Sequence, residues 1–119
     1  MNSRQKGNTT QRRAIKYLEE LGYLVGKVEQ GGRFTKVKDL FGLFDLCCVH
    51  ESVGVLFVQV KTNQPASQKP LQDFSITYSQ RSSCMTWYDR VGWVFHHYEP
   101  DGTITRIDKR KRSLKKGVS

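Results

Sequence analysis

The sequence predicts a small single-domain α/β protein with the element order αβββαββ, in which helices flank a central mixed sheet. Its 119 residues are 37% hydrophobic and 26% charged, which is typical of one globular domain with a single core. Apolar residues also switch between helical spacing and strand-like runs along the chain. We expect one domain over residues 1–108 and a basic flexible tail over 109–119.

A first helix is predicted around residues 11–21. Apolar residues recur there at spacings of three and four from Ala14 onward, which gives the helix one buried face. Gln11 precedes this stripe by three residues and therefore lies on the same side. It is either a first-turn residue satisfied by water, with Thr9 or Thr10 as the cap, or part of a site.

Two strand-like segments follow, over residues 43–49 and 53–61, with a polar turn between them. An antiparallel hairpin with this turn pairs residues whose numbers sum to about 104. Asp45 then lies opposite Gln59, and Lys61 points to the same face because side chains alternate along a strand. The three polar side chains form either an ion pair at the sheet edge or a site, because burying them unpaired is costly.

The remaining elements complete the pattern. A strand is expected over residues 23–30, and a second helix over 67–80, with Pro70 near its first turn. Two strands, over 91–98 and 103–107, end the domain.

Basic residues supply an argument about partners, because Lys and Arg outnumber Asp and Glu by 20 to 11. They crowd the tail after residue 108, and such a run binds any polyanion. Others lie around the first helix and in the segment before Asp45, where they are either phosphate contacts or ordinary surface charges. The candidate DNA-binding residues are Arg4, Lys6, Arg12, Arg13, Arg33, Lys36, Lys38, Lys109, Arg110, Lys111 and Arg112.

A membrane or secreted destination is not expected. The sequence has no apolar run of transmembrane length, and its N-terminus lacks the pattern of a signal peptide. Cys47, Cys48 and Cys84 have no metal-ligand spacing, so we expect free thiols. The protein is expected in the cytoplasm, or in the host cytoplasm if it is viral.

The segments KDLFGLFDLCCV and VLFVQVKTN resemble the core of the PD-(D/E)XK nuclease superfamily, whose hairpin carries an aspartate, an acidic or amide residue, one spacer and a lysine. The segment KGNTTQRRAIKYLEELGY resembles the first helix of archaeal and phage-type Holliday-junction resolvases. The resemblance covers roughly residues 6–64. It implies a restriction-endonuclease-like fold and a homodimeric, Mg²⁺-dependent endonuclease that hydrolyses phosphodiester bonds in branched DNA, with Mn²⁺ as a possible substitute.

The resemblance also assigns roles to residues. Asp45, Gln59 and the Val60 carbonyl would hold the metal ion. Lys61 would orient the attacking water or stabilise developing charge, and Gln11 would be an outer ligand or hold a water. Both glutamines stand where the family has carboxylates, so metal affinity is expected to be weaker.

Two alternatives remain open. One is a nuclease fold that has lost its chemistry and serves as a DNA-binding module; the other is a nuclease of the virus-type replication-repair class with a different DNA substrate. The two glutamines favour the module, whereas the presence of both Asp45 and Lys61 argues against it. Glu29, near the end of the first expected strand, is a candidate replacement carboxylate, as are Glu19 and Glu20.

Overall fold

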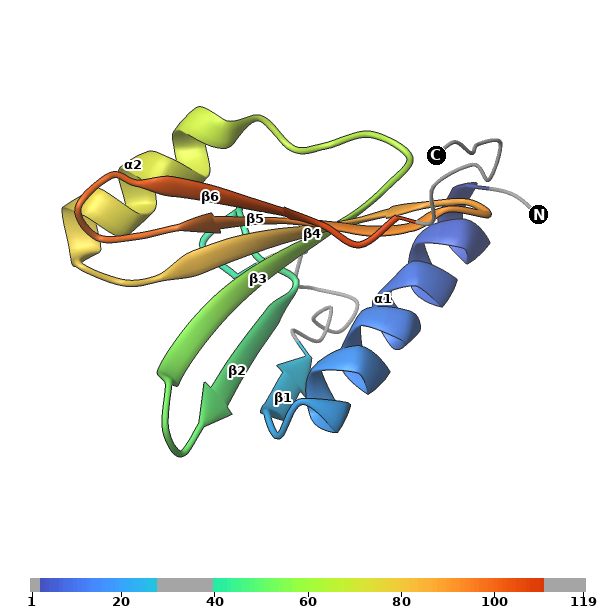
Figure 1. Cartoon of the computed structure of the whole chain (residues 1–119), viewed down its shortest axis with the longest axis horizontal. Coiled ribbons are helices and arrows are strands. Elements are labelled where there is room, and N and C mark those ends of the chain that lie inside the picture. The colour runs from blue at the N-terminus through green and yellow to red at the C-terminus, as the bar shows by residue number, and fades with distance from the viewer. Residues whose placement is uncertain (1–2, 28–39, 111–119) are drawn as a thin grey trace, which may run out of the picture.

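The computed structural model describes residues 3–27 and 40–110, and it describes the side chains of residues 9–27 and 40–110. Two helices and a six-stranded mixed sheet make up this part of the chain (Figure 1), which confirms the α/β fold class. The elements are α1 (Ser3–Glu20), β1 (Leu24–Lys27), β2 (Leu46–His50), β3 (Gly54–Thr62), α2 (Gln68–Tyr78), β4 (Ser82–Tyr88), β5 (Gly92–Tyr98) and β6 (Ile104–Asp108).

The strands lie in the sheet in the same order as in the sequence, from β1 at one edge to β6 at the other. Neighbouring strands are antiparallel except β3 and β4, which are parallel because α2 crosses over between them. In the β2–β3 hairpin Leu46 pairs with Val58 and Cys47 pairs with Phe57. This is the register that the sequence predicts.

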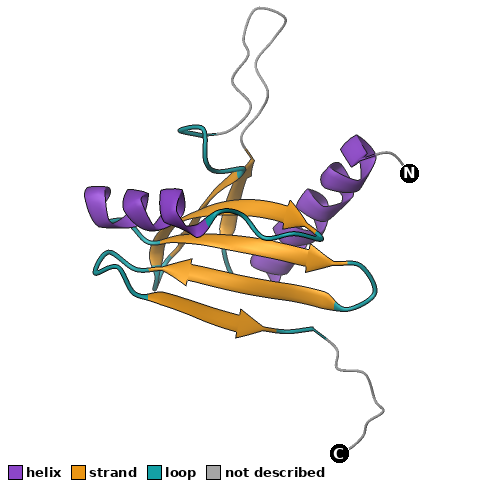
Figure 2. Cartoon of the chain, turned by 90° about the horizontal axis from the view of Figure 1, so that it is seen from above, coloured by secondary structure: helices purple, strands orange, loops and turns teal. Residues whose placement is uncertain are grey.

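The two helices cover opposite faces of the sheet (Figure 2), and each has its own core. Ala14 and Leu18 of α1 pack on Leu46, Val58 and Met85, among other residues of the first face. On the second face, the residues packed together include Phe44, Leu71, Cys84 and Tyr98. We call these the α1 face and the α2 face. Alternation along each strand decides which side chains reach which face.

The structure corrects two details of the sequence prediction. α1 already begins at Ser3, so Thr9 and Thr10 are not caps but interior residues of the helix. The predicted order αβββαββ also lacked β4. Residues 82–86 are small or polar for the most part and resemble a loop in composition, yet they are fully buried because β3 and β5 flank the strand.

Two further expectations can be compared with the structure. The cysteines are free thiols, and Cys48 and Cys84 are buried. Neither of the described helices has the length and apolar character needed to cross a membrane.

Candidate active site

Asp45 lies where a tight turn meets β2. Leu40 and Phe44 close this turn with two backbone hydrogen bonds: the Leu40 N–H donates to the Phe44 carbonyl at 2.7 Å, and the Phe44 N–H donates to the Leu40 carbonyl at 3.0 Å. The Phe44 side chain is fully buried, which anchors the turn in the α2-face core. The Asp45 N–H then donates to the Val58 carbonyl at 2.9 Å. The aspartate backbone is therefore fixed from both sides.

The Asp45 carboxylate reaches across to β3. Its Oδ2 accepts a hydrogen bond of 2.7 Å from the Val60 N–H, in a partly buried position. The paired register ends at Leu46 and Val58, and the Asp45 N–H just before it bonds to the Val58 carbonyl, so Asp45 lies beside the Val58–Val60 segment of β3. Alternation places Gln59 and Lys61 on the α2 face, whereas the Val60 side chain packs in the α1-face core. The hairpin therefore brings together the acid, the amide and the lysine that the sequence pairs.

Cys84 of β4 lies beside these residues. It is the register partner of Gln59 and is almost completely buried. Burial raises the pKa of its thiol, while a hydrogen bond with the Ala66 backbone and the nearby charge of Lys61 lower it and the charge of Asp45 raises it slightly. Both charged groups are thus close enough to Cys84 to act on the pKa of its thiol. At neutral pH this thiol is protonated and uncharged.

α1 reaches the same end of β3 from the other face. The Thr62 hydroxyl, one residue beyond Lys61, donates a hydrogen bond of 2.8 Å to the Thr10 hydroxyl. Gln11 follows Thr10 and is partly buried. Arg13 contacts Trp87 of β4, and Tyr17 contacts Trp93 of β5. Because the helix repeats every 3.6 residues or about that, Gln11 lies on the other side of α1, toward β2. Gln11 therefore lies near the end of β3, and its role in the site stays a prediction.

Oxygen donors dominate the candidate site. A carboxylate from Asp45, an amide from Gln59 and the backbone carbonyl of Val60 are hard ligands of the kind that Mg²⁺ takes, together with waters and substrate phosphates. Among the described residues, no group of three or more His, Cys, Asp and Glu could hold a metal ion. With only one carboxylate, this donor set fits a Mg²⁺ ion whose remaining ligands are waters or a bound anion. Glu19 and Glu20 are exposed on α1, and Glu29 lies outside the described residues.

Several of the predicted DNA-binding residues can be located. Arg12 and Arg13 are exposed on α1. Lys109 and Arg110 are attached to the sheet: the Lys109 N–H donates to the Trp93 carbonyl at 2.8 Å, and Arg110 bonds to Asp108. Arg4 and Lys6 belong to α1, but their side chains lie outside the described part, as do the whole residues Arg33, Lys36, Lys38, Lys111 and Arg112.

Sequence reasoning passed over some residues beside this site. Thr10 and Thr62 were not linked, because a contact between a helix and a strand 52 positions apart leaves no periodic signal. Arg90 and Arg106 were not named, because each lies next to or near an aspartate and outside the basic clusters of the sequence. Their placement depends on β4, the strand that the sequence did not reveal.

Comparison with known proteins shows which solved structure has a similar fold. No family model matches the chain, and no curated protein matches it. Among solved structures, it is similar to Hjc from Archaeoglobus fulgidus, described as a Holliday junction resolvase from an archaeal hyperthermophile, with a TM-score of 0.55 and 16% sequence identity. The alignment covers 87% of this chain and 88% of that chain. Over most of its length, the chain has the fold of an archaeal Holliday junction resolvase.

Proposed function

We propose that this protein is a metal-dependent DNA endonuclease that cleaves branched DNA, as a Holliday-junction resolvase does. One observation carries the proposal: the Asp45 carboxylate reaches β3 at Val60, between Gln59 and Lys61, in a sheet whose fold is similar to that of a resolvase. A structural ion pair between Asp45 and Lys61 would not need the amide of Gln59 beside it. The basic composition, with 20 Lys and Arg against 11 Asp and Glu, suits a polyanionic substrate.

In this proposal Asp45, Gln59 and the Val60 carbonyl hold Mg²⁺, and Mn²⁺ can replace it. When bound there, Mg²⁺ would lower the pKa of a water molecule and neutralise charge on the scissile phosphate. The Lys61 ammonium lies on the same face and stabilises the negative charge that develops on the phosphate oxygens. Gln11 holds a water or acts as an outer ligand. The Val60 N–H keeps the Asp45 carboxylate in place during these steps.

A homodimer follows from the same proposal, because two cuts in opposite strands of a junction need two sites. The surface that suits a second copy is the aromatic groove, a cavity of about 810 Å³ on the α2 side. Its lining includes Phe41, Leu43, Phe57, Pro70, Phe74 and Tyr78.

Exposure and charge favour a second copy as the occupant of the aromatic groove. Phe41 and Tyr78 are each 63% exposed, although both rings lie against Phe74. Phe41 also has a φ of 58°, an unfavourable value for a bulky residue, so the turn holds its ring at the surface at a cost. The charged pair beside the groove, Lys69 and Asp73 at 3.2 Å, is neutral overall. This pair therefore adds no repulsion between two copies of a chain whose net charge is +9.

The test is cleavage of a labelled four-way junction and a matched linear duplex with Mg²⁺, with Mn²⁺ and with a chelator. Wild type is run beside Asp45→Asn and Asp45→Ala. Asp45→Asn keeps an oxygen that can accept the Val60 N–H bond but removes the charge, so it separates chemistry from structure. We expect paired, metal-dependent cuts in the junction by wild type, and no cuts by either variant.

Other results would assign another function. Cleavage that survives in Asp45→Asn would remove Asp45 from the site and overturn the proposal. Equal cutting of junction and duplex would indicate a nuclease with a different substrate, such as one of the virus-type replication-repair class. Binding of DNA without cutting in either metal ion would identify an inactive DNA-binding module.

A further inference from the structure

We propose that arginines around the turn between β4 and β5 form a surface that binds DNA backbone phosphates close to the cleaved bond. This inference rests on the proposed function, because it names the surface that holds the substrate of that site. The members of this arginine band are Arg13, Arg90, Arg106 and Arg110. They come from α1, from the turn, from β6 and from the residues after β6.

The arginine band is tied directly to the candidate site. Asn63, two residues beyond Lys61, exchanges two hydrogen bonds with Asp89: its Nδ2 donates to the Asp89 carboxylate at 3.0 Å, and its Oδ1 accepts from the Asp89 N–H at 2.9 Å. The Asn63 N–H also donates to the Trp87 carbonyl at 2.7 Å. The chain just past Lys61 is therefore fixed to the turn that carries Arg90.

The distance between Lys61 and the arginine band matches the spacing of nucleotides along DNA. Lys61 pairs with Thr86, and Tyr88 lies two residues further along β4. Strand spacing and rise per residue then place the Tyr88 backbone about 8 Å from that of Lys61. This equals roughly two to three base pairs of duplex rise. A strand whose scissile phosphate lies at Lys61 would pass the arginine band within a few nucleotides.

Aromatic rings hold two of the guanidinium groups. The Arg13 guanidinium lies 4.3 Å from the centre of the Trp87 ring, and that of Arg110 lies 5.2 Å from the centre of the Tyr88 ring. Because Trp87 and Tyr88 are successive residues of a strand, their rings point to opposite faces of the sheet. The two arginines thus stand on either side of the sheet end, and Arg90 occupies the exposed turn beyond it.

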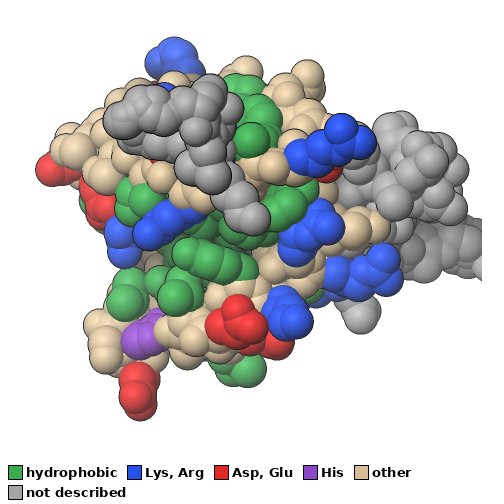
Figure 3. All heavy atoms as spheres, turned by 45° about the vertical axis from the view of Figure 1, so that its right-hand side comes forward, with side chains coloured by type: hydrophobic (Ala, Val, Ile, Leu, Met, Phe, Trp, Pro, Cys, Tyr) green, Lys and Arg blue, Asp and Glu red, His purple; other side chains and the backbone are tan. Residues whose placement is uncertain are grey.

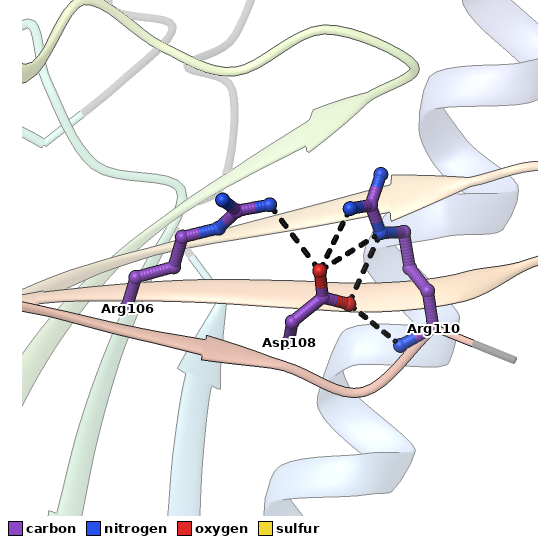
Figure 4. A network of polar contacts seen from close by, with 3 residues as sticks. All are labelled: Arg106, Asp108 and Arg110. Carbon is purple, nitrogen blue, oxygen red and sulfur yellow. Dashed lines mark hydrogen bonds and ion pairs between the residues drawn. The ribbon is translucent and has the colours of Figure 1, made fainter. Parts of the chain in front are cut away.

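Asp108 orders the arginines of the α2 face (Figure 4). Its carboxylate accepts hydrogen bonds from the side chain of Arg110, at 2.7 Å from Nη2, and from the Nη2 of Arg106 at 3.2 Å. These bonds, chiefly that from Arg110, lower the pKa of Asp108 to about 2, so it stays an anion. One carboxylate between two guanidinium groups leaves the cluster with a net positive charge while fixing how its donors point.

A glycine makes room for this arrangement. Gly92 has a φ of 124°, and a Cβ at this position would lie 3.1 Å from the Lys109 carbonyl oxygen and 3.5 Å from the Arg110 Cα. The chain after β6 can therefore pass close to the start of β5, which brings Arg110 over Tyr88. Arg110 is in this way part of the folded surface, although the sequence suggests a mobile tail.

The arginine band is also open to a ligand. The side chains of Arg106 and Arg110 are 55% and 37% exposed in spite of their bonds to Asp108. Figure 3, in which the end of the molecule that carries α1 comes forward, shows several Lys and Arg side chains exposed in the right-hand half of the view and others at its top and left. Ordered, exposed guanidinium groups lose little side-chain freedom on binding, and their fork geometry matches phosphate oxygens.

The experiment measures binding of a four-way junction and of a duplex without metal ion over a range of salt concentrations. The variants are Arg90→Gly, Arg110→Ala and the double variant. Arg90→Gly suits the φ of 68° at this position, so it removes the charge without straining the turn. The matched control is Lys69→Ala, which removes the same charge from α2, at the opposite end of the sheet (Figure 1). Because Lys69 lies beside the aromatic groove, light scattering first verifies that this variant keeps the oligomeric state of wild type.

We expect each arginine substitution to lower the number of phosphate contacts read from the salt dependence by about one, and the double variant to bind about tenfold more weakly. Lys69→Ala should leave both quantities nearly unchanged. If Arg110→Ala lowers the melting temperature, its weaker binding no longer reports the lost charge alone. The binding of Arg90→Gly then decides whether the proposal holds. Arginine variants that bind like wild type, or no worse than Lys69→Ala, overturn the arginine band.

The outcomes separate this inference from the proposed function. Wild type that cuts junctions, with variants that bind normally, overturns the arginine band alone. Weakened binding by the variants, with a wild type that cuts nothing, supports the arginine band and overturns the nuclease. A wild type that binds no DNA at all overturns both.

Discussion

Asp45 combines a structural and a proposed chemical task in a single carboxylate. Its Oδ2 accepts the Val60 N–H at 2.7 Å, a bond that the ladder between β2 and β3 would otherwise leave to the backbone. The same group is the only carboxylate among the proposed ligands. Loss of this side chain should therefore harm folding as well as cleavage, and the two effects can be measured apart.

The stability effect is predicted from the pair of substitutions at Asp45. Asp45→Ala leaves the partly buried Val60 N–H without its acceptor, so we expect it to unfold about 1 kcal/mol more easily than Asp45→Asn. Urea unfolding followed by circular dichroism measures the difference. Equal stability of the two variants would mean that water replaces the side-chain acceptor of the Val60 N–H at no cost.

Gln59 is predicted to limit metal affinity. In Gln59→Glu a second carboxylate joins Asp45 on the same face, and it adds a charged ligand for Mg²⁺. The concentration of Mg²⁺ needed for half-maximal cleavage should fall about tenfold, which corresponds to ~1.4 kcal/mol of binding free energy. An unchanged titration would show that Gln59 is not a metal ligand. Gln64→Glu, in the loop after β3, is the control for the added charge.

At the scale of elements, β5 carries a pH-sensitive contact. His97 is linked to the Ser83 hydroxyl of β4. Burial lowers the pKa of His97 below 6.5, and the neighbouring charges of Arg81 and His96 lower it further, while Glu99 acts in the opposite direction. Because the unfolded chain then takes up more protons than the folded one, stability is full above pH 6.5 and declines as the pH falls below it.

The matching measurement compares melting temperatures at about pH 7.5 and about pH 5.5. We expect wild type to lose more stability over this interval than His97→Gln, which can still bond to Ser83 but does not titrate. A variant with the same pH dependence as wild type would assign the effect to other groups, such as His96.

Adjacent elements were predictable from sequence, and distant ones were not. The β2–β3 hairpin has a short turn, so its register and the approach of Asp45 to this part of β3 follow from residue numbers. β4 was not predicted, because the usual composition of a strand reflects burial on one face. This strand is buried on both faces and has Ser and Thr at positions that normally hold large apolar residues. The arginine band could not be predicted from the sequence either, because the arrangement of its residues depends on β4.

For the whole molecule, the proposal of a homodimer makes a prediction about the aromatic groove. Tyr78 is 63% exposed there, so Tyr78→Glu should fold normally but place charges against each other in the dimer. We expect light scattering to show a dimer for wild type and a monomer for this variant. Leu24→Glu is the control, because Leu24 is 73% exposed on β1, away from the groove. A variant that stays dimeric would place the interface elsewhere.

The two edges of the sheet bear on how copies of the protein meet. Within the described part of the chain, β1 at one edge spans four residues, and β6 at the other is exposed along its whole length and carries Arg106 and Asp108. Short or charged edges resist the addition of a further strand from another chain. Two copies should therefore keep separate sheets, and concentrated solutions should not grow cross-β fibrils through these edges. Association is left to side chains on the faces.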